Sequence, residues 1–243
     1  MRYAILISYD GSGFSGFQKQ NDEKTIQGEI ERVLLVVLNE KVSLVGCGRT
    51  DSGVSAVDCL CHFDYKEEIN FNRFVGYSNS LLPETIRIKN IKMVSDDFHA
   101  RYSATSKTYE YYFYVGDKTP FYEKFASNIG YNVNIEKMQE ACKYFIGEHD
   151  FTSFCSSNTS VENKVRTIYN LEIKGVEDNL YKLIIKGNGF LYNMVRIIMG
   201  TLVNIGLGKI EPKDVENIIL CKDRSKSGKT MPAKGLVLKK VGY

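Results

Sequence analysis

Residues 42–56, VSLVGCGRTDSGVSA, begin as an apolar segment typical of a buried strand and then break into a turn flanked by Gly48 and Gly53. The turn carries Arg49 and Asp51, two opposite charges placed two residues apart. Aspartate before Ser-Gly is a common turn former, because its carboxylate bonds to its own backbone. A nearby cation also keeps a carboxylate ionised, and an ionised carboxylate is a competent nucleophile or base. The stretch therefore predicts a strand that delivers a candidate reactive carboxylate.

The hydrophobic pattern on both sides of this stretch alternates between strands and single helices. Thr25 is placed to cap a helix that ends near Leu38, and Asn134 to cap another that Gly147 ends. A long apolar helix is predicted over 190–205. Strands are predicted at 2–8, 42–47, 57–64, 86–94, 107–115, 165–174, 180–187 and 235–241, and shorter helices near 71–80, ended by Pro83, and after Pro212.

This order of elements predicts the fold class and the domains. Strands mixed with single helices, without regular βα alternation, favour an α+β fold with a largely antiparallel sheet. The order recurs in two halves, so we expect domains at 1–105 and 106–243. In each half the helices can cover one face of the sheet, which leaves the other face for a ligand.

The charge is unevenly distributed along the chain. The net charge is only +3, and the composition, 43% hydrophobic and 25% charged, is ordinary for a globular protein. Residues 1–105 hold 12 Lys and Arg against 14 Asp and Glu, whereas residues 106–243 hold 20 against 15. Residues 222–240 contain seven basic residues and one acid. Such a tail can follow phosphates, and the alternative is a solvated lysine-rich surface.

The cysteines and the apolar runs limit which classes of protein the sequence can belong to. The six cysteines form no CxxC pair, and Cys59, Cys61 and His62 have no second ligand cluster nearby, so we predict reduced thiols and no metal site. The opening MRYAILISYD reads as a strand and not as a signal peptide, and the longest apolar run, VLLVVL, is too short to span a bilayer. We therefore expect a cytoplasmic protein without a membrane partner or a cofactor.

Two further segments carry candidate chemistry. In GNGFLYNMVRIIMGTL, residues 187–202, Arg196 is the single charge on a mostly apolar helix, which predicts a buried anionic partner or a substrate. The alternative is an arginine that extends from the helix edge into water. Residues 109–114 form an aromatic strand. Its rings could stack on unpaired bases or could simply fill the core.

Nine motifs, in chain order, resemble those of the tRNA pseudouridine synthase A (TruA) family, and together they cover nearly the whole chain. They are YDGSGFSGFQ, TIQGEIE, GRTDSGVSA, CHFDY, NSLLPETIRI, FHARYSATSKTYEYYF, HDFTSFC, GNGFLYNMVRIIMGTL and SGKTMPAKGLVL. The resemblance implies the pseudouridine synthase fold, in which two ferredoxin-like (RRM-like) halves form one mixed, mainly antiparallel sheet with a central active-site cleft. It also implies a homodimer that converts uridine to pseudouridine in the anticodon arm of tRNA, at positions 38–40 just 3′ of the anticodon, by flipping the base and without a cofactor.

The resemblance also assigns roles to individual residues. Asp51 would be the catalytic carboxylate, Arg196 the arginine that pairs with it, and Tyr109 the ring that packs on uracil and accepts the C5 proton. Attack at C1′, attack at C6 and removal of a sugar proton all stay open for Asp51. Arg49 would fill the gap left by the flipped base. Substrate contact is further implied for Leu236, and RNA contact for Phe17, Gln18, Lys107, Arg224, Lys226, Lys229 and Lys234.

The match has departures. Phe17 stands where the family usually has tryptophan, Ser55 where it has histidine, and Lys107 and Cys155 where it has arginine. These positions bear on how RNA is held and not on the carboxylate.

Two alternative functions remain at this stage. One is an RNA-binding module without catalysis, which needs the basic tail and the aromatic strand but no Asp51–Arg196 pair. The other is a glycoside-type hydrolase with Asp51 as nucleophile, which needs a second carboxylate as acid. Asp58 and Asp64 are the close candidates in sequence, and neither lies in a motif.

Overall fold

The computed structural model describes residues 1–157, 159 and 161–243. The chain divides into two compact units: unit 1 is Met1–Thr105 with Val237–Tyr243, and unit 2 is Ser106–Leu236. Two hydrogen bonds attach the C-terminal segment to unit 1. The backbone N–H of Thr105 donates to the carbonyl of Gly242 at 2.8 Å, and the hydroxyl of Tyr243 donates to the carbonyl of Ala100 at 2.8 Å. The expected second domain, 106–243, is therefore shorter at its C-terminal end than the sequence indicates.

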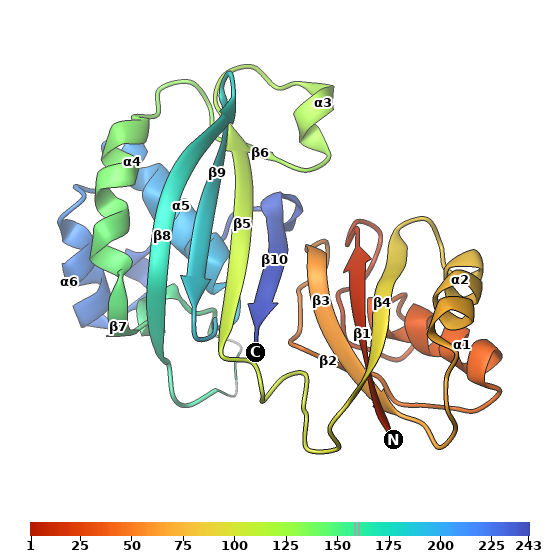
Figure 1. The fold of residues 1–243 in the computed structure, drawn as a ribbon. Helices are drawn as coiled ribbons and strands as arrows, with labels where there is room; N and C mark the ends of the chain where they lie inside the picture. Colours follow the sequence, from red (N-terminus) through yellow and green to blue (C-terminus); the bar gives the residue numbers. More distant parts are fainter. Residues whose placement is uncertain (158, 160) are drawn as a thin grey trace. The chain divides into compact units, whose positions relative to one another are not determined.

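Unit 1 is a small sheet with two helices, drawn in red to yellow in Figure 1 except for its C-terminal strand. Strand β1 (Arg2–Tyr9) pairs antiparallel with β3 (Ser55–Asp64) and with β4 (Ile86–Val94). Strand β10 (Leu236–Gly242) runs parallel to β3, and the two-residue β2 (Val45–Gly46) pairs antiparallel with β3. Helices α1 (Ile26–Leu38) and α2 (Phe71–Leu81) complete the unit.

Unit 2 is an antiparallel sheet whose strands follow the order β5, β9, β8, β7, with helices α4, α5 and α6 gathered on one side (Figure 1). The short β6 runs parallel to β5. The strands are β5 (Ser106–Tyr114), β6 (Ser127–Asn128), β7 (Gly147–Asp150), β8 (Val165–Glu177) and β9 (Leu180–Gly187). The helices are α3 (Pro120–Glu123), α4 (Ile135–Cys142), α5 (Met194–Gly206) and α6 (Asp214–Cys221), with 3-10 turns at Lys143–Phe145, Thr152–Phe154, Arg224–Lys226 and Ala233–Gly235.

The predicted fold class and most of its elements are confirmed. The sheets are mixed and mainly antiparallel, with helices packed on them. Both predicted caps are present: the side chain of Thr25 accepts from the backbone N–H of Gly28 at 3.2 Å, and that of Asn134 accepts from Lys137 at 2.8 Å. Each cap satisfies a backbone donor that the helix itself leaves unpaired.

The structure differs from the prediction at three places. The strand expected at 42–47 is reduced to β2, where Val45 and Gly46 pair with β3. Helix α5 begins at Met194 and not near 190, because Asn193 adopts a left-handed φ of 61° that the helix cannot continue through. The elements α3, β6 and β7 were not predicted, since they are too short to show a hydrophobic period.

No helix in the described part of the chain is both long enough and apolar enough to cross a membrane.

Candidate active site

The loop that carries Asp51 is fixed through its backbone and its neighbours within unit 1. The backbone N–H of Phe17 donates to the carbonyl of Thr50 at 3.1 Å, and that of Val54 donates to the carbonyl of Asp51 at 3.1 Å. The buried hydroxyl of Thr50 shares a 2.8 Å hydrogen bond with the hydroxyl of Tyr9 on β1. The position of Asp51 is therefore set by both ends of its turn.

Two glycines allow the segment after β1 to lie directly on this loop. A Cβ atom on Gly16 would lie 2.9 Å from the carbonyl oxygen of Thr50, and one on Gly11 would lie 2.1 Å from that of Val54. Gly16 also has a φ of 96°, which L side chains rarely adopt. The motif YDGSGFSGFQ thus serves as a backbone support for the Asp51 loop, a role that its glycines alone do not reveal.

Phe17 lies in the core of unit 1. Its side chain is 3% exposed, its ring packs near Tyr9 at 6.2 Å, and a Cβ on Gly46 would lie 2.5 Å from it. The ring has no surface to offer to RNA, which corrects the RNA contact that the resemblance implied. Phe17 instead fixes the end of β2, immediately before the Asp51 loop.

The other predicted residues of unit 1 lie on its surface or beside the loop. Gln18 and Arg49 are exposed. The hydroxyl of Ser55, at the position where the family has histidine, accepts a 3.0 Å hydrogen bond from the backbone N–H of Gly11. Ser55 therefore contributes to the same backbone support as the glycines.

Cys47, which precedes the Asp51 loop, forms a cluster with Cys59 and Cys61 of β3. The sulfur atoms of Cys47 and Cys59 lie 3.3 Å apart, and those of Cys59 and Cys61 lie 3.9 Å apart. These three cysteines are buried, as are Cys142 and Cys155, whereas Cys221 is exposed. Within the described residues no group of His, Cys, Asp and Glu side chains is placed to hold a metal ion.

In unit 2, Tyr109 and Arg196 lie on β5 and α5. The ring of Tyr109 meets Phe190 edge to face, with centroids 5.2 Å apart and planes at 86°. Arg196 donates from Nη1 to Oδ1 of Asn193 at 2.6 Å and from Nε to the carbonyl oxygen of Met231 at 2.6 Å. These two acceptors are neutral oxygen atoms, and together they orient the guanidinium. No local sequence pattern connects Met231 with Arg196, because the two residues are 35 positions apart.

The segment 228–231 lies directly on α5 and holds Arg196 in place. The backbone N–H of Met231 donates to the carbonyl of Arg196 at 3.2 Å, and that of Gly228 donates to the hydroxyl of Thr201 at 2.8 Å. A Cβ on Gly228 would lie 2.2 Å from the carbonyl carbon of Gly200, so both glycines are needed for this approach. The motif SGKTMPAKGLVL is therefore in part a brace for the arginine.

The aromatic strand β5 is mainly a core strand. Tyr111, Phe113 and Tyr114 are at most 1% exposed, which supports the core alternative for these rings. Burial raises the pKa of Tyr111 to about 12, and its hydroxyl donates to the carbonyl of Pro232 at 2.8 Å. Burial, together with a hydrogen bond to Glu110, raises the pKa of Tyr112 to about 12. Neither of these two tyrosines is suited to accept a proton near neutral pH.

The basic tail separates into lysines on the surface and two residues with structural partners. Arg224 donates to the hydroxyls of Ser227 and Thr230 and to the carbonyl of Gly228, so it stabilises the tail itself. Lys234 forms a 2.7 Å ion pair with Glu123. These contacts give Arg224 and Lys234 structural partners, and their contact with RNA stays a prediction. Lys226 and Lys229 are exposed and form no ion pair within the described residues.

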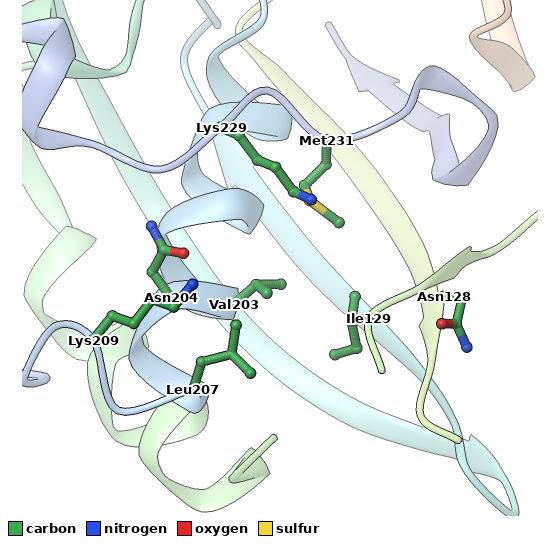
Figure 2. A pocket seen from close by; sticks show the side chains of 8 residues that line it. All are labelled: Asn128, Ile129, Val203, Asn204, Leu207, Lys209, Lys229 and Met231. Carbon is green, nitrogen blue, oxygen red and sulfur yellow. The ribbon is translucent and has the colours of Figure 1, made fainter. Parts of the chain in front are cut away.

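Lys229 also lines a pocket of about 270 Å³ in unit 2 (Figure 2). The pocket has no carboxylate in its lining, and the carbonyl of one lining residue, Met231, accepts from Arg196. An anionic group would therefore meet positive charge here beside the segment that braces the arginine. The lining consists of Asn128, Ile129, Val203, Asn204, Leu207, Lys209, Lys229 and Met231.

Lys107 and Leu236, the last two predicted site residues, both lie on strands. Lys107 lies on β5 opposite Gly187 of β9. Leu236 is the first residue of β10 and follows the 3-10 turn Ala233–Gly235.

Comparison with known proteins gives a consistent result. A family model described as tRNA pseudouridine synthase matches residues 141–243. The tRNA pseudouridine synthase A of Brevibacillus brevis is 44% identical over 246 residues, covering 100% of this chain and 99% of that protein. The protein of the same name from Bacillus subtilis is 45% identical over 247 residues, with the same coverage. That of Caldicellulosiruptor bescii is 44% identical over 245 residues, covering 100% of both.

Proposed function

The chain belongs to the tRNA pseudouridine synthase A family and converts uridine to pseudouridine in tRNA, and from this premise we propose that Asp51 is the catalytic carboxylate. The observation that carries the proposal is the rigid loop around it. Hydrogen bonds at Thr50 and Val54 and the close backbone contact at Gly16 hold the turn in one conformation. A reacting group that is held in place before the substrate arrives loses little entropy in the reaction.

The reaction determines what the other groups have to do. The N1–C1′ bond of uridine breaks and a C5–C1′ bond forms, so the product is an isomer and no electrons are gained or lost. The base has to leave the RNA stack, which requires a few kcal/mol. A proton then has to leave C5. Asp51 can attack C1′, attack C6 or remove a sugar proton, and these three routes share the requirement that its carboxylate is ionised.

Arg196 is proposed to supply the positive charge that keeps the catalytic carboxylate ionised. Two neutral acceptors, Asn193 and Met231, fix the plane of the guanidinium. Lysine could not replace it fully, because an ammonium group cannot keep the same planar set of hydrogen bonds.

Tyr109 is proposed to pack on the uracil and to accept the C5 proton. Its neighbour Phe190 supports the ring from one edge. A phenol is a weak base near neutral pH, so this role requires that nearby positive charge lowers the pKa of the hydroxyl. Arg49 is proposed to fill the gap in the RNA stack, and Leu236 to contact the flipped base.

We further propose that the tRNA backbone lies along Lys226 and Lys229, with Gln18 and Lys107 as additional RNA contacts. The pocket beside Lys229 supports this, because its lining contains a second lysine, Lys209, and no acid. The targets are proposed to lie in the anticodon arm, just 3′ of the anticodon, and the enzyme to act as a homodimer in the cytoplasm.

One experiment tests these points together. Unmodified tRNA is incubated with the protein, and pseudouridines are mapped by position. Products confined to the anticodon arm are expected. Release of free uracil would instead indicate a hydrolase, and unchanged tRNA that remains bound would indicate a binding module.

A further inference from the structure

The segment 118–125, here called the α3 tip, is a short excursion between β5 and β6 of unit 2 (Figure 1). It contains helix α3 and carries Phe121, whose side chain is 84% exposed. Among the large apolar residues of the described chain, none is more exposed. An apolar ring held in water contributes nothing to burial, so its presence here calls for another reason.

The inner side of the α3 tip is firmly attached to unit 2. The ammonium group of Lys234 pairs with the carboxylate of Glu123 at 2.7 Å. It also donates to the backbone carbonyl oxygen of Glu123 at 2.9 Å. The hydroxyl of Tyr114 donates to the same carboxylate. The hydroxyl of Tyr122 donates to Glu177 at 2.7 Å. The tip is therefore held at several points and does not depend on Phe121 for its position.

The other two aromatic residues of the tip make ring contacts, although Phe125 is still 41% exposed. Phe125 contacts Tyr112 and Tyr122, each with ring centroids 6.0 Å apart, and Tyr122 contacts Tyr114 at 5.3 Å. Phe121 has no ring contact of this kind within the described residues. The packing thus explains Tyr122 and Phe125 and leaves Phe121 directed at solvent.

The charge around Phe121 favours an anionic ligand. Lys118 and Lys124 flank it in sequence, are exposed, and form no ion pair within the described residues. Glu123 is the only carboxylate of the tip, and it is balanced by Lys234. Hydrogen bonds from Lys234 and Tyr114, and more weakly the charge of Lys118, hold the pKa of Glu123 below its ordinary value. Within residues 118–125 the two exposed lysines therefore outnumber the one carboxylate, whereas Asp117 precedes the tip and Glu177 accepts from Tyr122.

We propose that Phe121 is a stacking platform for an unpaired base of the tRNA substrate, with Lys118 and Lys124 beside the neighbouring phosphates. An aromatic ring between cations matches the two features of single-stranded RNA, a flat base and an anionic backbone. Because phenylalanine has no hydrogen-bonding group, the contact holds the tRNA without selecting a base. The proposal rests on tRNA being the substrate, and it gives Lys234 an indirect role as the residue that positions the tip.

The test compares the affinity of unmodified tRNA for four proteins at fixed salt. Phe121→Ala should raise the Kd by about 5- to 150-fold, the range expected for the loss of one aromatic–base stack. Phe121→Trp should stay close to wild type, because it retains a flat ring. Leu220→Ala is the matched control, since Leu220 on α6 is 75% exposed and lies outside the tip. It should leave the Kd unchanged.

A second measurement separates stacking from charge. The slope of log Kd against log salt should be the same for Phe121→Ala as for wild type. If Lys118 and Lys124 each contact a phosphate, Lys118→Gln and Lys124→Gln should each lower that slope by ~0.7–0.9. A Kd for Phe121→Ala within twofold of wild type would overturn the proposal. So would a change in sedimentation without a change in Kd, which would make Phe121 a contact between copies of the chain. If wild type itself formed no pseudouridine, the proposed function would fail instead, which is a distinct result.

Discussion

The Asp51 loop and the Arg196 region present the two opposite charges of the proposed chemistry, and they hold them by different means. The loop is fixed through backbone contacts: the carbonyls of Thr50 and Asp51 accept hydrogen bonds, and Gly16 lies against the turn. Arg196 is fixed through its own side chain, which donates to Asn193 and Met231.

This difference determines how mutations should be interpreted. A substitution that changes only the carboxylate of Asp51 leaves the backbone contacts of its loop intact. A substitution at Arg196 also leaves the acceptors of Asn193 and Met231 without their donor. An unsatisfied polar group in a partly buried site costs about 1–3 kcal/mol. Activity lost at Arg196 therefore combines chemistry with local structure.

The largest effect is expected for Asp51→Asn, which keeps the shape of the side chain and removes its charge. Pseudouridine formation should fall by ~10⁴-fold or more, as for other groups that react directly with substrate. The affinity for tRNA should stay within several-fold, because phosphate contacts supply most of it. Thermal unfolding, measured alongside, shows whether the variant remains folded. Turnover above about a hundredth of the wild-type rate would contradict the role of Asp51.

The next effect concerns Tyr109, the proposed proton acceptor. Tyr109→Phe keeps the ring and removes the hydroxyl, so multiple-turnover activity should fall by ~10²-fold or more while tRNA affinity stays near wild type. Tyr109→Leu should also lose the stacking contact, which adds about 1–3 kcal/mol to the binding defect. Single-turnover time courses and tRNA affinities for both variants make the comparison. If Tyr109→Phe turns over normally, the C5 proton leaves by another group and Tyr109 is only a platform.

Arg196→Lys tests the comparison directly, since it keeps the charge and removes the planar donor set. We expect the rate to fall by ~10-fold or more and the free energy of unfolding to fall by about 1–2 kcal/mol. Asp51→Asn, measured alongside, should show the larger rate loss. An Arg196→Lys variant with full stability and full activity would mean that the hydrogen bonds to Asn193 and Met231 are dispensable.

A feature can be predicted from the sequence when the residues that determine it are close together along the chain. The helix caps at Thr25 and Asn134 depend on residues three positions away, and both were predicted correctly. The family motifs identify Asp51, Tyr109 and Arg196 as candidates. The contacts that hold them are less accessible, because Met231 lies 35 positions from Arg196 and no local pattern connects them.

The same limit applies to the surroundings of Lys234 and Phe17. Lys234 reads as a surface cation in a basic tail, yet its partner Glu123 lies 111 positions earlier in the chain. Phe17 lies among glycines and polar residues, which suggests exposure. Its burial depends on Gly46, where the absence of a side chain makes room for the ring. Both assignments require the tertiary structure, since composition near a residue does not report its distant neighbours.

The smallest effects are expected in the basic tail, which serves both as the brace of Arg196 and as the proposed RNA surface. Lys226→Ala and Lys229→Ala should each raise KM by several-fold and lower the slope of log affinity against log salt by ~0.7–0.9, because each removes one exposed cation from the path of the phosphates. Lys234→Ala should behave differently. It breaks the ion pair with Glu123, so it should weaken tRNA binding through the α3 tip while leaving the salt slope unchanged. Affinities measured at several salt concentrations for the three variants distinguish a phosphate contact from a positioning residue. A slope change at Lys234 equal to that at Lys229 would place Lys234 on the RNA after all, and unchanged slopes at all three would return the tail to a solvated surface.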